Sequence, residues 1–186
     1  MEEVKHIIEV LKDTKDALSK RDALKLKDLS NQTIHSASVE QDETSITLAV
    51  ITYSLSKIVE RTNYQKYPDW EKFIKKSLIY IEKAIGFLEK NNRKMFEKNI
   101  MEIEKLIDKL SGNFKAHIQQ VFEKARINKA SRIYEHGISM ERTAKLLGIT
   151  LFELADYAGK TGIHDIELSS TLTVKKRLKY LEDLFK

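Results

Sequence analysis

Apolar residues recur at intervals of three and four along most of the chain, which is the spacing of helices that bury one face. One such stripe starts at Val4, a long one starts at Trp70, and a third starts at Phe96 and ends before Gly112. Pro68, the single proline, suits the first turn of the long helix, because that position needs no backbone N–H donor. The stripes consist of Val4, Ile7, Ile8, Leu11 and Leu18; of Trp70, Phe73, Ile74, Leu78, Ile81, Ile85 and Leu88; and of Phe96, Ile100, Ile103, Ile107 and Leu110.

Two further helices are predicted between the first two stripes. Residues 22–39 are rather polar, whereas residues 44–59 are apolar on most faces. A helix that is apolar all round has to be buried on all sides. We therefore expect residues 44–59 at the centre of a helical bundle, with the neighbouring helices around them.

The pattern changes near residue 130. Four of the six glycines fall between positions 137 and 162, so the helices there are short and the turns are tight. A connecting helix is predicted to lead into this region from the bundle. Its apolar positions are Phe114, Ile118, Phe122, Ala125 and Ile133.

Residues 139–163 divide into two helices joined by a tight turn. Ser139 and Thr150 are good N-cap residues, so one helix is predicted to start at each of them. Gly148 lies between the two helices and can accept the left-handed backbone that the turn requires. The residues expected to pack between the helices are Ala144, Ile149 and Leu154.

With this spacing, residues 130–163 resemble the helix-turn-helix of phage repressor and Cro proteins and of small antitoxin-like proteins. The resemblance implies a three-helix unit that binds DNA, with the second helix of the turn in the major groove. The segment Ser30–Asp42 is similar to part of uncharacterised archaeal helical proteins, which implies no activity. We interpret its polar side chains, His35 among them, as a hydrogen-bonded layer between packed helices, the alternative being a contact site for a small ligand or RNA.

We therefore predict an all-α protein in two parts. Residues 1–112 form an N-terminal helical bundle, and residues 113–186 comprise the connecting helix, a small trihelical helix-turn-helix unit and a C-terminal amphipathic helix. That last helix carries a narrow apolar seam, which favours a homodimer, the alternative being a helix that folds back on its own bundle. The seam consists of Val174, Leu178, Leu181 and Phe185.

The charges of the helix-turn-helix unit do not favour base-specific reading. The face that its second helix would turn toward a groove has no lysine or arginine, and Glu153 and Asp156 would repel phosphates. Contacts to nucleic acid are therefore expected from Thr150 and from the basic residues of the unit and its flanks. The predicted set is Lys124, Arg126, Lys129, Arg132, Arg142, Lys145, Thr150, Lys160, Lys175, Lys176, Arg177 and Lys179.

The function predicted from these features is that of a nucleic-acid-binding protein, a transcriptional regulator, with DNA or RNA as its partner. The formal net charge of +5, from 33 basic and 28 acidic residues, permits this function without requiring it. The alternative is an interaction adaptor, antitoxin-like or a scaffold, whose trihelical unit binds a protein through Leu151 and Phe152.

The composition argues against several other classes of protein. The chain has no cysteine, which excludes disulfides, thiol nucleophiles and cysteine-based zinc sites. Its five histidines lack metal-binding spacing and no phosphate loop or catalytic constellation is found, so we expect no metal, cofactor or enzymatic activity, and an α-helical hydrolase ranks last. The longest uncharged run, residues 44–56, is shorter than the ~20 residues of a membrane span, so we expect no membrane partner and a cytoplasmic location.

Overall fold

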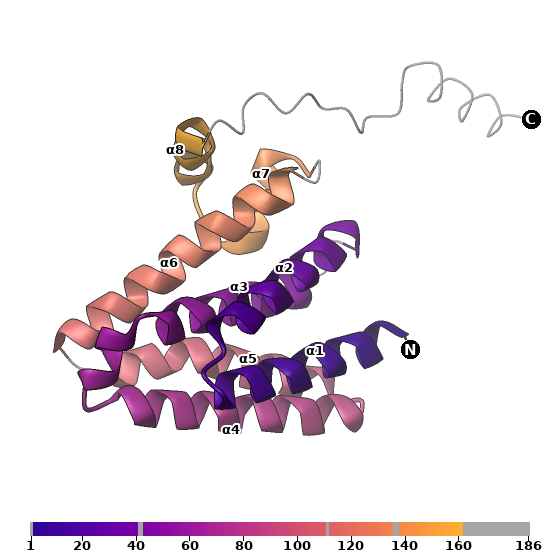
Figure 1. The fold of residues 1–186 in the computed structure, drawn as a ribbon. Coiled ribbons are helices and arrows are strands. Elements are labelled where there is room, and N and C mark those ends of the chain that lie inside the picture. The colour runs from indigo at the N-terminus through magenta and orange to yellow at the C-terminus, as the bar shows by residue number, and fades with distance from the viewer. Residues whose placement is uncertain (1, 41–42, 111, 136–137, 162–186) are drawn as a thin grey trace, which may run out of the picture.

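The computed structural model describes residues 2–40, 43–110, 112–135 and 138–161. Within these ranges the chain contains eight α-helices, two short 3₁₀ helices and no strand, which confirms the all-α prediction (Figure 1). No helix of the described part is long and apolar enough to cross a membrane. The elements are α1 (Glu2–Ser19), α2 (Ala23–Glu40), α3 (Glu43–Glu60), η1 (Thr62–Lys66), α4 (Trp70–Glu89), α5 (Arg93–Lys105), η2 (Leu106–Lys109), α6 (Gly112–Glu135), α7 (Met140–Leu147) and α8 (Leu151–Thr161).

The most apolar helix, α3, lies at the centre of the molecule. It packs against α1, α2, α5, α6 and α7, while α1 also packs on α4 and α4 on α5. Ile46, Leu55 and Ile58 of α3 are fully buried. Its small polar residues can be buried as well, because a side chain such as that of Ser54 donates a hydrogen bond to the carbonyl of Val50 at 2.8 Å. The central position expected for residues 44–59 is confirmed.

Aromatic rings fill the bundle core at the point where α6 begins. Phe114 is only 2% exposed, and its ring centroid lies 5.0 Å from that of Tyr67, 6.4 Å from that of Trp70 and 6.5 Å from that of Phe73. Tyr64 adds an edge contact at 6.0 Å. The connecting helix therefore contributes to the bundle core, and side-chain contacts cross the predicted boundary between residues 112 and 113.

A second, smaller core forms around the C-terminal half of α6. This core joins α6, α7 and α8 to α2 and α3, so the three-helix unit rests directly on the bundle. In Figure 1, α7 and α8 lie at the end of α6 that is far from α4. The buried apolar residues of the second core are Ile34, Ile46, Ala49, Val50, Ala125, Ala130, Ile133, Ile138, Ala144, Leu147 and Leu154.

Two helix ends differ from the prediction. The third apolar stripe continues to Leu110, but α5 ends at Lys105 and the chain tightens into the 3₁₀ helix η2. The change of helix type keeps the apolar side chains buried, which is why the stripe alone did not show it. Pro68 precedes the N-cap Asp69 and so lies before the first turn of α4 rather than within it.

Candidate nucleic-acid interface

The helix α7 begins and ends at the residues that its sequence indicates. Ser139 is the N-cap, and its hydroxyl accepts a hydrogen bond from the amide of Arg142 at 3.3 Å. Gly148 is the C-cap in the left-handed conformation, with φ of +63°, and the next amide, that of Ile149, donates to the carbonyl of Ala144 at 3.1 Å. Glycine is favoured at Gly148 because a side chain there would strain the backbone.

The helix α8 begins with a capping box that the sequence analysis missed. The amide of Glu153 donates to the hydroxyl of Thr150 at 3.1 Å, and the Glu153 carboxylate accepts hydrogen bonds from the Thr150 amide at 2.8 Å and from its hydroxyl at 2.7 Å. Both hydrogen bonds from Thr150 hold the pKa of the Glu153 carboxyl below its usual value, and the bond from the amide contributes more than that from the hydroxyl. The Thr-x-x-Glu spacing was the signal for this motif. Thr150, predicted to contact nucleic acid, is thus already engaged as a cap.

Two adjacent apolar side chains at the start of α8 face solvent. Phe152 is 81% exposed and Leu151 is 51% exposed, whereas Leu154 is fully buried in the second core. Ala144 is buried and Ile149 is half-buried, in agreement with their predicted packing between the helices. The start of α8 therefore presents an apolar surface that no described part of the chain covers.

Lys129 does not lie on the surface, which corrects its predicted role as a phosphate contact. Its side chain is fully buried, and its ammonium group donates a hydrogen bond to Oδ1 of Asn31 at 2.9 Å. The same nitrogen lies 4.4 Å from the ring centroid of Tyr53. The amine is thus enclosed between α6, α2 and α3 and cannot reach an external phosphate in this conformation.

The environment of Lys129 disfavours its charged form. Burial, and then the positive charges of Arg132 and Lys27, lower the pKa of Lys129 to about 8. The sequence indicates that Lys129 is buried, because it lies four residues from both Ala125 and Ile133, which line the buried side of α6. The prediction that Lys129 is a cation at the surface rested on its residue type alone.

Three other cations of the predicted set form ion pairs with nearby carboxylates. Such pairs at a surface contribute only ~0–1 kcal/mol, so a phosphate can compete for these side chains. The pairs are Arg126 with Glu104 at 2.5 Å, Arg132 with Glu135 at 3.0 Å, and Lys160 with Asp156 at 2.6 Å.

Arg142 and Lys145 of α7 are exposed and make no ion pair with a described residue. They are three residues apart, so both lie on the same side of their helix. Lys124 is exposed as well, but it lines a cleft beside α3. The remaining predicted cations and the apolar seam lie outside the described residues; these are Lys175, Lys176, Arg177 and Lys179, and Val174, Leu178, Leu181 and Phe185.

The polar segment of α2 serves packing where the structure describes it. Ser30 is buried, and its hydroxyl donates to the carbonyl of Ala49 in α3 at 2.7 Å. Asn31 accepts the hydrogen bond from Lys129 in α6. These bonds join three helices, as expected of a hydrogen-bonded layer, while the side chain of His35 lies outside the described part.

Comparison of the chain with family models, with curated proteins and with solved structures finds no match. Among the described residues, no three His, Asp or Glu side chains gather in a way that could hold a metal ion. The surface of α7 and α8 comprises the exposed cations of α7, the apolar start of α8 and the ion-paired cations around them.

Proposed function

We propose that the protein binds nucleic acid through α7 and α8, with affinity that comes from phosphates rather than from base recognition. The observation that carries this proposal is the pair of exposed cations without ion-pair partners in the described ranges, Arg142 and Lys145, on one side of α7. In helix-turn-helix proteins the first helix of the motif crosses the phosphate backbone while the second enters the groove. Cations on α7 are therefore placed where such a protein needs them.

The distribution of charge along the chain supports the proposal. Residues 112–186 carry 13 basic and nine acidic side chains, whereas residues 1–111 carry 20 basic and 19 acidic ones. Nearly all of the net positive charge thus belongs to the part that contains α6, α7 and α8. A local excess of this kind attracts a polyanion and raises the rate at which it associates.

The surface of α8 argues against direct reading of bases. Its exposed start consists of Leu151 and Phe152, and its one cation, Lys160, is paired with Asp156. The side chains that usually read base edges are Arg, Lys, Asn and Gln, and α8 offers none of these without a partner. We therefore propose a transcriptional regulator whose binding is governed by the phosphate backbone and is strongly dependent on salt.

The experiment is fluorescence anisotropy with mixed-sequence duplex DNA and with RNA, repeated over a range of salt concentrations. Replacing two phosphate-contacting cations should reduce the slope of log affinity against log salt by about 2 for duplex DNA, because each contact contributes about 0.9. The test variant is Arg142→Gln with Lys145→Gln. The matched control is Lys94→Gln with Lys98→Gln, which removes two exposed cations of α5 and the same charge.

The proposal requires a difference between these two double variants. A lower slope and a lower affinity for every sequence in the α7 variant alone would support it. Equal slopes for both variants would remove α7 from the interface. No binding of DNA or RNA by the intact chain at low salt would overturn nucleic-acid binding altogether.

A second candidate function, binding of a protein partner, is favoured by the 81% exposure of Phe152. A neighbouring apolar residue, Leu151, enlarges the same surface, and adjacent exposed apolar side chains are typical of interfaces. Cross-linking in cells with mass spectrometry can compare Phe152→Ser with Leu24→Ser, since Leu24 is 69% exposed on the bundle. A protein captured by Leu24→Ser and by the unmodified chain, but not by Phe152→Ser, would support this candidate; identical capture by all three would exclude it.

A further inference from the structure

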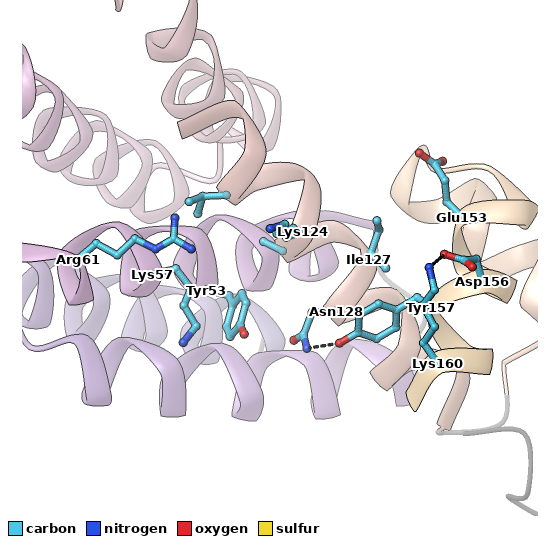
Figure 2. A pocket seen from close by; sticks show the side chains of 12 residues that line it. Tyr53, Lys57, Arg61, Lys124, Ile127, Asn128, Glu153, Asp156, Tyr157 and Lys160 are labelled. Carbon is cyan, nitrogen blue, oxygen red and sulfur yellow. Dashed lines mark hydrogen bonds and ion pairs between the residues drawn. The ribbon is translucent and has the colours of Figure 1, made fainter. Parts of the chain in front are cut away.

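A cleft of about 480 Å³ lies between α3, α6 and α8 (Figure 2). On α3 it is lined by Tyr53 and Lys57, which are four residues apart and so share one side of the helix. Arg61, the residue directly after α3, lines it as well. On α6 it is lined by residues that include Lys124 and Asn128, again four apart. The cleft thus runs along these helices and is closed by α8 on its third side.

The net positive charge of the cleft lies on the sides formed by α3 with Arg61 after it and by α6. Four cations and two carboxylates line the cleft, and both carboxylates belong to α8. There Asp156 pairs with Lys160 at 2.6 Å, and Glu153 is engaged in the capping box with Thr150. Lys57, Arg61 and Lys124 have no carboxylate partner among the residues that line the cleft (Figure 2).

Two of these cations are held in position by neighbours outside the cleft. The guanidinium of Arg61 lies 5.4 Å from the ring centroid of Tyr64 and donates a hydrogen bond to its hydroxyl. Lys57 forms an ion pair with Glu60 at 2.7 Å. Lys124 makes no ion pair with a described residue. Side chains that are already oriented lose less conformational entropy when they bind an anion.

Most of the surface inside the cleft is nevertheless apolar. Val121 and Ala125 of α6 line it together with the rings of Tyr53 and Tyr157. Between the rings, the side-chain amide of Asn128 donates a hydrogen bond to the hydroxyl of Tyr157 at 3.3 Å (Figure 2). One amide hydrogen and the amide oxygen of Asn128 are left for a ligand.

We propose that this cleft binds a nucleotide, with its phosphate at Arg61 and Lys124 and its base beside Tyr157 and Asn128. The volume falls in the range of ~300–1,000 Å³ that is typical of small-ligand sites, and a largely apolar lining with a few converging polar groups is their usual composition. A nucleotide combines the two required properties, an anionic phosphate and a flat ring whose edge forms hydrogen bonds. An inorganic anion would leave the apolar lining uncovered, and a neutral apolar molecule would leave the cations without a counter-charge.

The test is calorimetric titration of the full chain with the four common ribonucleoside monophosphates, with adenosine and with inorganic phosphate. At least one monophosphate should bind. Adenosine and inorganic phosphate should each bind at least about tenfold more weakly, because adenosine lacks the phosphate and inorganic phosphate lacks the base. Amide NMR shifts should change at Tyr157 and Asn128 on binding. Replacing Arg61→Gln together with Lys124→Gln should weaken binding of the nucleotide about tenfold or more.

The control for this variant is the same Lys94→Gln and Lys98→Gln pair, which removes equal charge at residues that do not line the cleft. Circular dichroism and thermal melting show whether both variants fold. Three results would each overturn the proposal: no monophosphate binds at millimolar concentration, both variants bind a nucleotide equally, or phosphate alone binds as tightly as the nucleotide. Tyr157→Phe supplies a further measurement, since loss of the hydrogen bond to Asn128 should lower the affinity for a nucleotide more than that for phosphate.

The nucleotide can come from solution or from the end of a strand, and titration with a short single-stranded oligonucleotide distinguishes these sources. If the oligonucleotide binds more tightly than any monophosphate and loses the same factor in the cleft variant, the cleft receives a strand. If the cleft variant affects only the monophosphate, the cleft binds a free nucleotide, and failure of nucleic-acid binding at α7 leaves this result unchanged.

Discussion

The two cores of the molecule are built from different side chains. The larger core, formed by the bundle and the start of α6, contains large rings such as Trp70, Phe73, Phe96 and Phe114. The smaller core beneath α7 and α8 contains branched aliphatic residues and four alanines, with the charged side chain of Lys129 buried beside it. Small residues let helices approach closely but remove little apolar surface from water. The core at the end of the molecule that we propose to be functional therefore buries less apolar surface than the bundle core.

The two regions also differ in the charge of their sequences. The bundle has nearly equal numbers of basic and acidic residues, whereas the C-terminal part has an excess of four basic ones. The largest exposed fraction of an apolar side chain in the described ranges is that of Phe152, on α8. The large buried rings and the proposed binding surface thus belong to different regions. Two pairs of substitutions compare these regions, and a third compares a buried with an exposed lysine of the C-terminal part.

The largest expected effect comes from two phenylalanines, one from each region. Phe114→Ala should lower the free energy of unfolding by about 3–5 kcal/mol, because it removes the ring that contacts Tyr67, Trp70 and Phe73 and leaves a cavity. Phe152→Ala should change it by less than about 0.5 kcal/mol, since that side chain is exposed. Urea denaturation monitored by circular dichroism measures both. A loss in Phe114→Ala as small as that expected for Phe152→Ala would contradict the assignment of Phe114 to the bundle core.

The second prediction concerns Lys129. Replacing a buried charge that has no carboxylate partner should stabilise the fold, so Lys129→Met is expected to raise the free energy of unfolding at pH 7 by roughly 1–3 kcal/mol. The amide of Asn31 loses a donor but is exposed and can bond to water. Denaturation of Lys145→Met, which alters an exposed lysine of α7, is the control and should show little change.

The effect of Lys129→Met should depend on pH in a defined direction. The pKa of Lys129 is about 8 in the folded chain and 10.5 ordinarily, so between these values the unfolded chain holds a proton that the folded chain has lost. The contribution of Lys129 to unfolding free energy therefore rises with pH in this window. The advantage of Lys129→Met over the unmodified chain should shrink as pH rises from 8 toward 10. An advantage that stays constant or grows over this range would show that burial does not lower this pKa.

The smallest expected effect compares two glycines. Gly148→Ala should destabilise the fold by about 1 kcal/mol, because the backbone there has φ of +63° although no atom would clash with the added methyl group. Gly86→Ala, in the interior of α4 with open space around it, should stabilise by up to about 1 kcal/mol through helix propensity. Thermal melting detects shifts of this size in both directions. A Gly148→Ala variant that melts no lower than the unmodified chain would mean that the turn after α7 does not require a left-handed residue.

Local patterns in the sequence determined the helices and their order. The start of α7 at Ser139, the left-handed turn at Gly148 and the burial of Leu154 all follow from residues that act within a few positions of one another. The central place of α3 followed from its composition, since an almost wholly apolar helix has nowhere else to lie. The N-cap Thr150 was predicted in the same way, but the hydrogen bonds that Glu153 accepts from Thr150 were missed, because Glu153 was considered only as a charge that repels phosphates.

Only the tertiary structure decided which charges are available and where a ligand can enter. Lys129 and Lys124 are both lysines of α6, yet one is buried beside Tyr53 and the other is exposed in the cleft. Their difference depends on how α2 and α3 cover one side of α6. The cleft likewise joins residues 53–61, 121–128 and 153–160, which are far apart in the chain. Sequence spacing reports the side of a helix on which a residue lies, but the neighbour that covers that side is set by packing between distant segments, and burial and charge pairing are fixed only then.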